Sequence, residues 1–192
     1  MTELSPRRRQ LLDAALHVVA DDGLRGLTHR AVDRRAELPE GTCSAYFRTR
    51  HALQAALTEY VADALLADVD ELVVQMRSCP PDDNEGVSAA LDLFLRWIDQ
   101  RELLIARLEL TMAATRNAEL SRLLADHRDR LVELVDEIMQ AAGKEHSADR
   151  AEALVASYDG VLIAALLKPV RERRAFLTRS LDLLGNGLSA PV

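Results

Sequence analysis

The stretch from Leu27 to Leu53 constrains this chain most, because it is typical of two short helices joined by a tight turn. The hydroxyl of Thr28 can accept hydrogen bonds from free amide groups at a helix start, which predicts a first helix from about Thr28 to Arg35. Pro39 lacks an amide hydrogen and suits a first helical turn, which predicts a second helix from about Pro39 to Phe47. Two such helices with a three- or four-residue turn form a helix-turn-helix.

Small and basic side chains accompany the second predicted helix. Small residues allow a backbone to lie close to a groove floor while small polar groups reach base edges, and here they are Gly41, Thr42, Ser44 and Ala45. Arginines neutralise phosphates, and those around the helix are Arg30, Arg34, Arg35, Arg48 and Arg50. The stretch therefore favours DNA binding, with Thr42 and Ser44 at base edges and Thr28, Tyr46, Arg48 and Arg50 at phosphates. Arg30 and Gly41 complete the predicted DNA-binding set.

Apolar periodicity predicts a long helix on each side of this motif. Upstream, an apolar stripe with helical spacing runs up to Gly23, which ends the helix, and it consists of Leu12, Ala15, Leu16 and Val19. Downstream, Thr49 caps a helix that extends to about Arg77. Its apolar residues recur every four positions, at Leu53, Leu57, Val61, Leu65 and Val69.

A wider set of positions between residues 7 and 60 follows one recurring pattern. It comprises Leu11-Leu12-x-Ala14-Ala15, Asp22-Gly23-Leu24, Thr28, Ala31-Val32, Ala36, Leu38, Gly41-Thr42, Tyr46-Phe47, Thr49-Arg50 and Leu53. On these residues the segment resembles the TetR/AcrR family of bacterial transcriptional regulators. The resemblance implies an all-α fold, in which a three-helix head carries the helix-turn-helix and a larger helical body binds an effector and dimerises. We therefore predict a DNA-binding head at residues 1–50 and a body at residues 51–192.

Four positions depart from the pattern of that family. The family usually has Gly where Glu37 stands, Ser where Pro39 stands, and Tyr where Ser44 stands. The resemblance assigns that tyrosine to DNA contact. Arg50 occupies a position that is usually lysine, which keeps the charge and adds a planar fork for phosphate oxygens.

The distribution of charge agrees with a head that approaches DNA and a body that does not. The chain of 192 residues carries a net charge of −7. Its first fifty residues hold nine arginines against seven acidic residues, a net +2, so the remainder carries −9. Only the head of such a regulator must approach phosphates.

The remaining chain predicts further helices and a dimer interface. We place these helices at about 85–100, 103–115, 118–142, 147–167 and 171–184, with Leu91, Leu95 and Ile98 facing inward in the first of them. The run Cys79–Asn84, with two prolines, marks a boundary before them, and Pro169 forces the last bend. Small residues crowd residues 147–167, and in the resembling family the last two helices pair with their copies. A homodimer through residues 147–184 is predicted, the alternative being an ordinary monomeric core helix.

A small-molecule pocket in the body is implied by the resemblance alone. Polar or aromatic residues in otherwise apolar stretches are its candidate lining: Trp97, Arg107, Thr111, Met112, His127 and Tyr158. The alternative is that Arg107 is a surface or paired residue and that Trp97 belongs to the core.

Several functional classes find no support in the sequence. Nucleotide-binding, zinc-protease and hydrolase motifs do not occur, and the five histidines stand apart, so we predict neither an enzyme nor a cofactor or metal. The two cysteines suggest no disulfide framework. No apolar segment is long enough to cross a membrane, so a soluble cytoplasmic protein without a membrane partner is predicted.

Two functions from different classes follow. The first is a ligand-responsive repressor whose dimer binds a palindromic operator in double-stranded DNA and is released by an unknown small-molecule effector. The alternative is a helical ligand-binding or protein-interaction module without sequence-specific DNA binding. Ser44, Pro39 and the modest charge of the head motivate that alternative.

Overall fold

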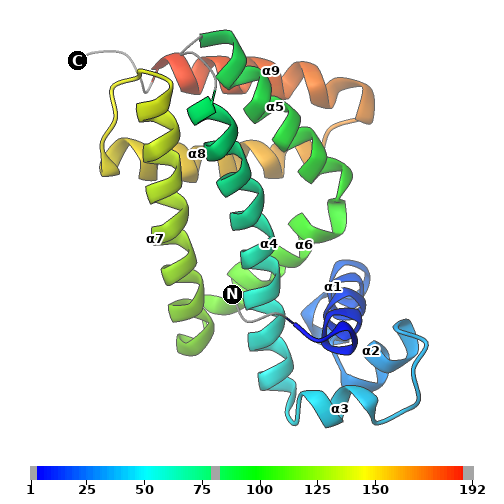
Figure 1. Cartoon of the computed structure of the whole chain (residues 1–192). Coiled ribbons are helices and arrows are strands. Elements are labelled where there is room, and N and C mark those ends of the chain that lie inside the picture. The colour runs from blue at the N-terminus through cyan, green and yellow to red at the C-terminus, as the bar shows by residue number, and fades with distance from the viewer. Residues whose placement is uncertain (1–3, 79–82, 188–192) are drawn as a thin grey trace. The chain divides into compact units, whose positions relative to one another are not determined.

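The computed structural model describes residues 4–78 and 83–187, and within these ranges the regular secondary structure is entirely helical (Figure 1). The helices are α1 (Pro6–Gly26), α2 (His29–Arg35), α3 (Thr42–Tyr46), α4 (Arg50–Ser78), α5 (Asp83–Asp99), α6 (Arg101–Ala114), α7 (Ala118–Ala141), α8 (Ala148–Leu166) and α9 (Val170–Gly187). The predicted all-α fold is confirmed. Of the predicted boundary at Cys79–Asn84, residues 79–82 lie outside the described residues.

The chain divides into two compact units by its internal contacts. Unit 1 contains residues 1–64 and 102–126, and unit 2 contains residues 65–101 and 127–192. Helices α4, α6 and α7 therefore each contribute to both units. This division by contacts is distinct from the functional division at residues 50 and 51, which stays a prediction.

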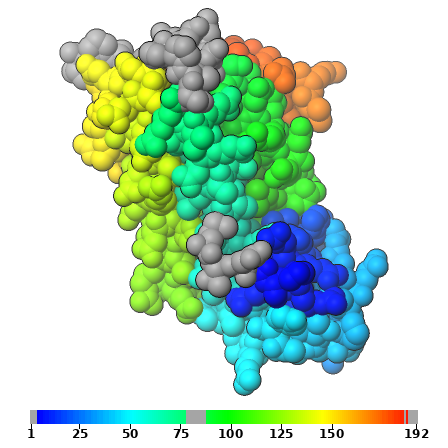
Figure 2. All heavy atoms as spheres, in the orientation of Figure 1, coloured from blue at the N-terminus to red at the C-terminus, as the bar shows by residue number. Residues whose placement is uncertain are grey.

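The core of unit 1 contains the apolar stripes that the sequence predicts. The stripe of α1, with Leu12, Ala15 and Val19, is buried, as are Leu53 and Leu57 of α4. Helix α1 packs against α2, and α2 packs against α3. Figure 2 shows the dark-blue surface of α1 directly against the lighter blue of the residues that follow it. These contacts fix the position of the short helices that carry the predicted DNA-binding residues.

Gly23 ends the regular part of α1, as predicted. Its φ of +67° lies in the left-handed region, where a glycine avoids the steric cost of a side chain. The next amide, of Leu24, donates a hydrogen bond of 3.1 Å to Oε2 of Glu109 on α6. Helix α6 thereby holds the corner between α1 and α2.

The core of unit 2 is built around an aromatic group on α5 and α8. The rings of Phe94 and Trp97 stack with centroids 5.5 Å apart, and Tyr158 meets Phe94 edge-on at 5.2 Å. Nε1 of Trp97 donates a hydrogen bond of 2.7 Å to Oδ2 of Asp68 on α4. Burial raises the pKa of Tyr158 to about 12. Helix α5 packs against both α8 and α9.

The prediction for the inward face of α5 was wrong at two positions. Leu93 and Phe94 are buried together with Ile98, whereas Leu91 and Leu95 are only partly buried. The buried face of α5 is therefore rotated from the predicted one toward Leu93, Phe94 and Trp97, and the helix packs against both α8 and α9.

Pro169 lies between α8 and α9, as predicted. The last carbonyl groups of α8 have no partners within the helix, and the guanidinium of Arg173 supplies donors for this end. Its Nε donates to the Lys168 carbonyl at 3.1 Å and its Nη2 to the Leu166 carbonyl at 3.3 Å. The turn is therefore held from α9, and the two helices lie next to one another (Figure 1).

Candidate nucleic-acid interface

Helices α2 and α3 form the predicted helix-turn-helix, but the second helix starts later than predicted. Helix α2 begins after Thr28, whose Oγ1 accepts a hydrogen bond from the Ala31 amide at 3.2 Å. Helix α3 begins at Thr42, and Pro39 lies in the turn before it. The reason is Gly41, which precedes α3 with a φ of +94°, whereas a regular right-handed α-helix requires a φ near −60°.

Asp33 of α2 supplies the cap that α3 lacks. Gly41 occupies the capping position and has no side chain, so the free amides of α3 need another acceptor. The buried carboxylate of Asp33 accepts hydrogen bonds from the Gly41 amide at 2.8 Å and from the Cys43 amide at 2.6 Å. Sequence reasoning missed Asp33. Two features of the sequence could have indicated it. Asp33 is an acidic residue next to the apolar Val32 on the first helix, and the second helix is preceded by a glycine, which has no side chain to cap it.

The thiol of Cys43 is buried under this cap. Burial, and then the charge of Asp33, raise the pKa of Cys43 to about 12. The thiol is therefore protonated near neutral pH and acts as a small apolar group in the core of the motif.

The C-terminal end of α2 has the hydrogen bonds of a Schellman motif. The Glu37 amide donates to the Arg34 carbonyl at 3.3 Å, and the Leu38 amide donates to the Asp33 carbonyl at 2.9 Å. Glu37 adopts a φ of +55° there, and it is the only described residue other than glycine with a positive φ. Glu37 stands at the position where the pattern of the TetR/AcrR family usually has glycine.

His29 joins the start of α2 to the end of α3. Its Nε2 lies 2.6 Å from the Phe47 carbonyl oxygen. A shallow hollow opens beside it between the two helices, lined by Thr28, His29, Arg30, Asp33, Glu40, Gly41 and Ser44. The structure thus brings together four of the residues predicted to bind DNA, namely Thr28, Arg30, Gly41 and Ser44.

The two hydroxyls predicted to face base edges are both bonded within the motif. Oγ1 of Thr42 donates to the Pro39 carbonyl at 2.7 Å, and Oγ of Ser44 donates to the Gly41 carbonyl at 2.8 Å. Ser44 is exposed and Thr42 is partly buried. The hydroxyl oxygen of each can still accept a hydrogen bond from outside.

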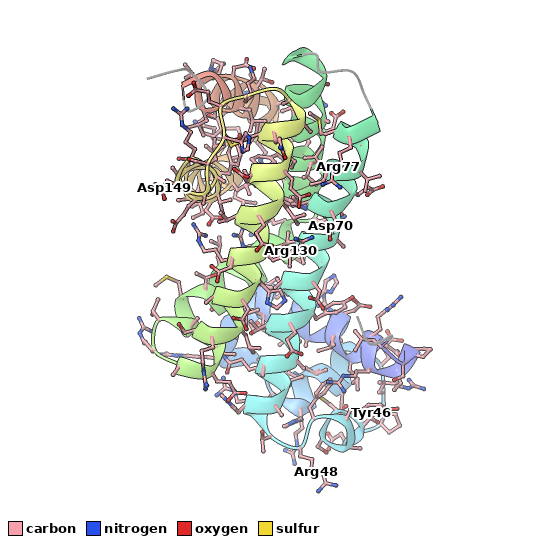
Figure 3. All side chains as sticks on the ribbon, turned by 60° about the vertical axis from the view of Figure 1, so that its left-hand side comes forward. Tyr46, Arg48, Asp70, Arg77, Arg130 and Asp149 are labelled. Atoms are coloured by element: carbon pink, nitrogen blue, oxygen red, sulfur yellow. The ribbon has the colours of Figure 1, made fainter. Side chains whose placement is uncertain are left out.

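The predicted phosphate-binding residues differ in their surroundings. Tyr46 is 44% exposed, and Arg48 is exposed and extends away from the helices in Figure 3. Arg50 instead binds the corner between α1 and α2. Its Nε donates to the Leu27 carbonyl at 3.0 Å and its Nη2 to the Leu24 carbonyl at 2.5 Å. Arg50 therefore has a structural role in addition to the phosphate contact that stays a prediction.

The residues predicted to line a ligand pocket are divided between the two units. Trp97 and Tyr158 come together in unit 2, where both contact the ring of Phe94, and His127 belongs to unit 2 as well. Arg107, Thr111 and Met112 belong to unit 1, where Thr111 and Met112 are exposed on α6. The assignment of these six residues to a pocket stays a prediction.

The described part of the chain contains neither a cluster of metal-binding side chains nor a membrane-spanning helix. No group of three or more His, Cys, Asp or Glu side chains there could hold a metal ion. None of the helices there is both long and apolar enough to span a membrane.

An exposed helix-turn-helix in an all-helical fold is the arrangement found in many DNA-binding proteins. Comparison with known proteins narrows this class. The family model "Tetracyclin repressor-like, C-terminal domain" matches residues 81–184, more than half of the chain. The chain belongs to the TetR family of transcriptional regulators, which confirms the resemblance seen in the head.

Individual relatives agree with this membership. The HTH-type transcriptional regulator PksA of Bacillus subtilis is 26% identical over 184 residues, which cover 90% of this chain and 85% of PksA. The crystal structure of a transcriptional regulator from Rhodococcus has a TM-score of 0.80 at 22% identity, covering 96% of each chain. The multidrug binding protein EbrR complexed with ethidium has a TM-score of 0.67 at 26% identity, covering 95% of this chain and 99% of EbrR.

Replacement of Asp33 tests the cap of α3. Asp33→Ala leaves the Gly41 and Cys43 amides without their acceptor and should lower the free energy of unfolding by about 2 to 3 kcal/mol. Asp33→Asn keeps one acceptor oxygen and should lose less. Chemical denaturation followed by circular dichroism measures both. Equal stability of Asp33→Ala and the unsubstituted protein would contradict the role of this carboxylate.

Replacement of Glu37 tests the left-handed position. Glycine adopts this φ without steric cost but loses more chain entropy on folding, so Glu37→Gly should change the stability by no more than about 1 kcal/mol. Glu37→Val places a β-branched side chain at the same φ and should destabilise the protein by at least about 1 kcal/mol. Thermal unfolding compares the two variants, and a valine variant as stable as the glycine variant would refute the interpretation.

Proposed function

We propose that this protein is a ligand-responsive transcriptional repressor that binds a palindromic operator as a homodimer. The observation that carries the proposal is the hollow between α2 and α3, where Thr28, Arg30, Gly41 and Ser44 come together on an exposed surface. In a helix-turn-helix, the second helix enters the major groove while flanking groups bind the backbone. That its relatives are transcriptional regulators supports this function over a helical module that does not read DNA.

The exposed side chains divide into two proposed roles. Thr42 and Ser44 on α3 read base edges, because they lie on the helix that enters the groove. Thr28, Tyr46 and Arg48 hold phosphates on its flanks, where contacts position the protein without reading sequence. Arg50 binds a phosphate in addition to the carbonyl groups of Leu24 and Leu27 between α1 and α2.

Helices α8 and α9 are the proposed dimer interface. These helices and the turn between them carry large apolar side chains that are exposed in the single chain, which are Ile163, Leu167, Val170 and Leu183. Gly160 on α8 is exposed, and a Cβ atom built on it would meet nothing within 4 Å. A second copy can therefore approach the backbone of α8 closely and cover these apolar groups. In a symmetric dimer the two heads then read two inverted half-sites.

A small molecule is the proposed effector. EbrR, which has the same fold, is a multidrug binding protein whose structures contain ethidium and malachite green. Helix α4 runs without a break from the head to unit 2, so displacement at its far end can move the head. A tenfold loss of operator affinity requires the effector to prefer the released conformation by about 1.4 kcal/mol. Since its target is the chromosome, we place the protein in the cytoplasm.

Promoter fragments from the neighbourhood of its gene provide the first test. We expect one fragment to bind the full-length protein at nanomolar concentration and physiological salt, and unrelated DNA of equal length to bind at least about a thousandfold more weakly. Fluorescence anisotropy with competitor DNA measures both. Equal affinity for all fragments would favour the alternative, a module without sequence-specific DNA binding.

Arg48 and Arg50 should separate binding of DNA from stabilisation of the head. Arg48 has no hydrogen bond or ion pair within the described part of the chain, so Arg48→Ala should weaken binding to all DNA sequences and leave the melting temperature unchanged. The slope of log K against log salt should fall by about one for each phosphate that the variant no longer binds. Arg50→Ala should lower the melting temperature as well. A decrease in affinity confined to the operator would refute the phosphate role of Arg48.

Gly160→Glu tests the dimer interface. The new side chain fits the single chain because nothing lies within 4 Å of its Cβ. In a dimer it would bury a carboxylate without a partner, which costs several kcal/mol. Sedimentation should therefore show a monomer with retained helicity. Gln140→Glu, at an exposed position of α7, is the matched control and should stay dimeric. A monomeric unsubstituted protein at micromolar concentration would remove the proposal.

A further inference from the structure

His29 lines the hollow between α2 and α3, and one of its ring nitrogens is hydrogen-bonded within the motif. Nε2 is 2.6 Å from the Phe47 carbonyl oxygen, which can only accept a hydrogen bond. Nε2 therefore carries a hydrogen in both the neutral and the charged ring. Nδ1 is the nitrogen that gains or loses the proton.

Nδ1 of His29 is open to the hollow. It has no hydrogen-bond partner within the described part of the chain, and it is not among the buried polar atoms that lack one. Because His29 itself is only partly buried, solvent reaches this nitrogen. Protonation adds an N–H donor and a positive charge there, and the bond to Phe47 is kept because the imidazolium also donates from Nε2.

The charges around His29 make this proton important for a phosphate. Arg30 and Asp33 of α2 and Glu40 of the turn line the hollow with it. With a neutral imidazole the hollow carries a net charge of −1, and with an imidazolium it is neutral. The carboxylate of Asp33 is held by two amides of the turn and α3, so Glu40 is the acid left to repel an approaching phosphate.

Cations on the neighbouring elements complete the surroundings. Arg48 follows Phe47 in the chain, and Arg50 binds the carbonyl of Leu27, two residues before His29. Both have fixed positive charges. Histidine is the side-chain type that can be either neutral or charged in the physiological range, and His29 is the histidine among the residues that line the hollow.

We propose that His29 is an additional phosphate-binding residue that acts in its protonated form, so that operator binding takes up a proton in each protomer. This inference rests on the proposed function. It adds a residue that is absent from the predicted DNA-binding set, and it assigns the ligand class, a DNA phosphate. It also makes operator affinity depend on pH by linkage, since the bound state holds more protons than the free state.

Operator affinity of the full chain at pH 6, 7 and 8 and constant ionic strength tests the proposal. For the unsubstituted protein we expect a dissociation constant at least about tenfold lower at pH 6 than at pH 8, because complete uptake of one proton changes the constant by about tenfold per pH unit. His29→Gln should lose most of this dependence, because an amide can donate to the Phe47 carbonyl but cannot ionise. His17→Gln on α1 is the matched control and should keep the full dependence.

Glu40→Gln provides a second variant that does not alter the His29–Phe47 bond. It removes the negative charge that opposes a phosphate, so operator affinity at pH 8 should rise and the dependence on pH should shrink. This variant decides the matter if His29→Gln loses helicity.

The outcomes separate the two proposals. An operator affinity that does not change between pH 6 and pH 8 overturns the role of His29 and leaves the proposed function intact. The same holds if His29→Gln folds and keeps the full dependence on pH. Failure of the unsubstituted protein to bind any promoter fragment at any of the three pH values overturns both proposals.

Discussion

The head depends on the two hydrogen bonds that the Asp33 carboxylate accepts from the start of α3. A helix of five residues is far too short to be stable alone in water, because nucleation is unfavourable and few internal bonds offset it. Helix α3 is therefore held by tertiary contacts. Asp33 accepts hydrogen bonds from its first turn, and His29 bonds to the Phe47 carbonyl directly after its last residue. The side chains of Cys43 and Phe47 are buried in the core.

The corner between α1 and α2 is likewise held by residues from outside it. The non-helical backbone of Gly23 interrupts α1 before this corner, and two long side chains from other helices bond the backbone beyond it. Arg50 of α4 binds its carbonyl groups, and Glu109 of α6 binds the amide of Leu24. A displacement of α4 or α6 in unit 1 would therefore act directly on the element that leads into α2.

Periodicity made the long helices predictable, whereas contacts between distant residues did not follow from it. The apolar spacing of α1 and α4 repeats over several turns, so their buried faces could be identified from the sequence. The start of α3 was misplaced because Pro39 suits a first helical turn, while the backbone conformation at Gly41 excludes one. The cap by Asp33 was missed because it joins two helices and not neighbours within one.

The candidate site was predictable to different degrees for similar reasons. Thr28, Arg30, Gly41 and Ser44 could be grouped because a helix-turn-helix brings residues close in the sequence together in space. The intramolecular bonds of Arg50 depend on a corner more than twenty residues away. The six candidate pocket residues were chosen for their polar or aromatic character within apolar stretches, which carries no information on spatial proximity, and they are divided between the two units.

Selection of bound sequences from a random pool of double-stranded DNA tests the central claim most directly. The full-length protein would be incubated with the pool at physiological salt, and the retained DNA sequenced over several rounds. The account predicts enrichment of an inverted repeat whose half-site centres lie one helical turn apart, about 34 to 36 Å, or a compatible multiple of it. Retained DNA without a common sequence, recovered with a folded protein, would contradict the account.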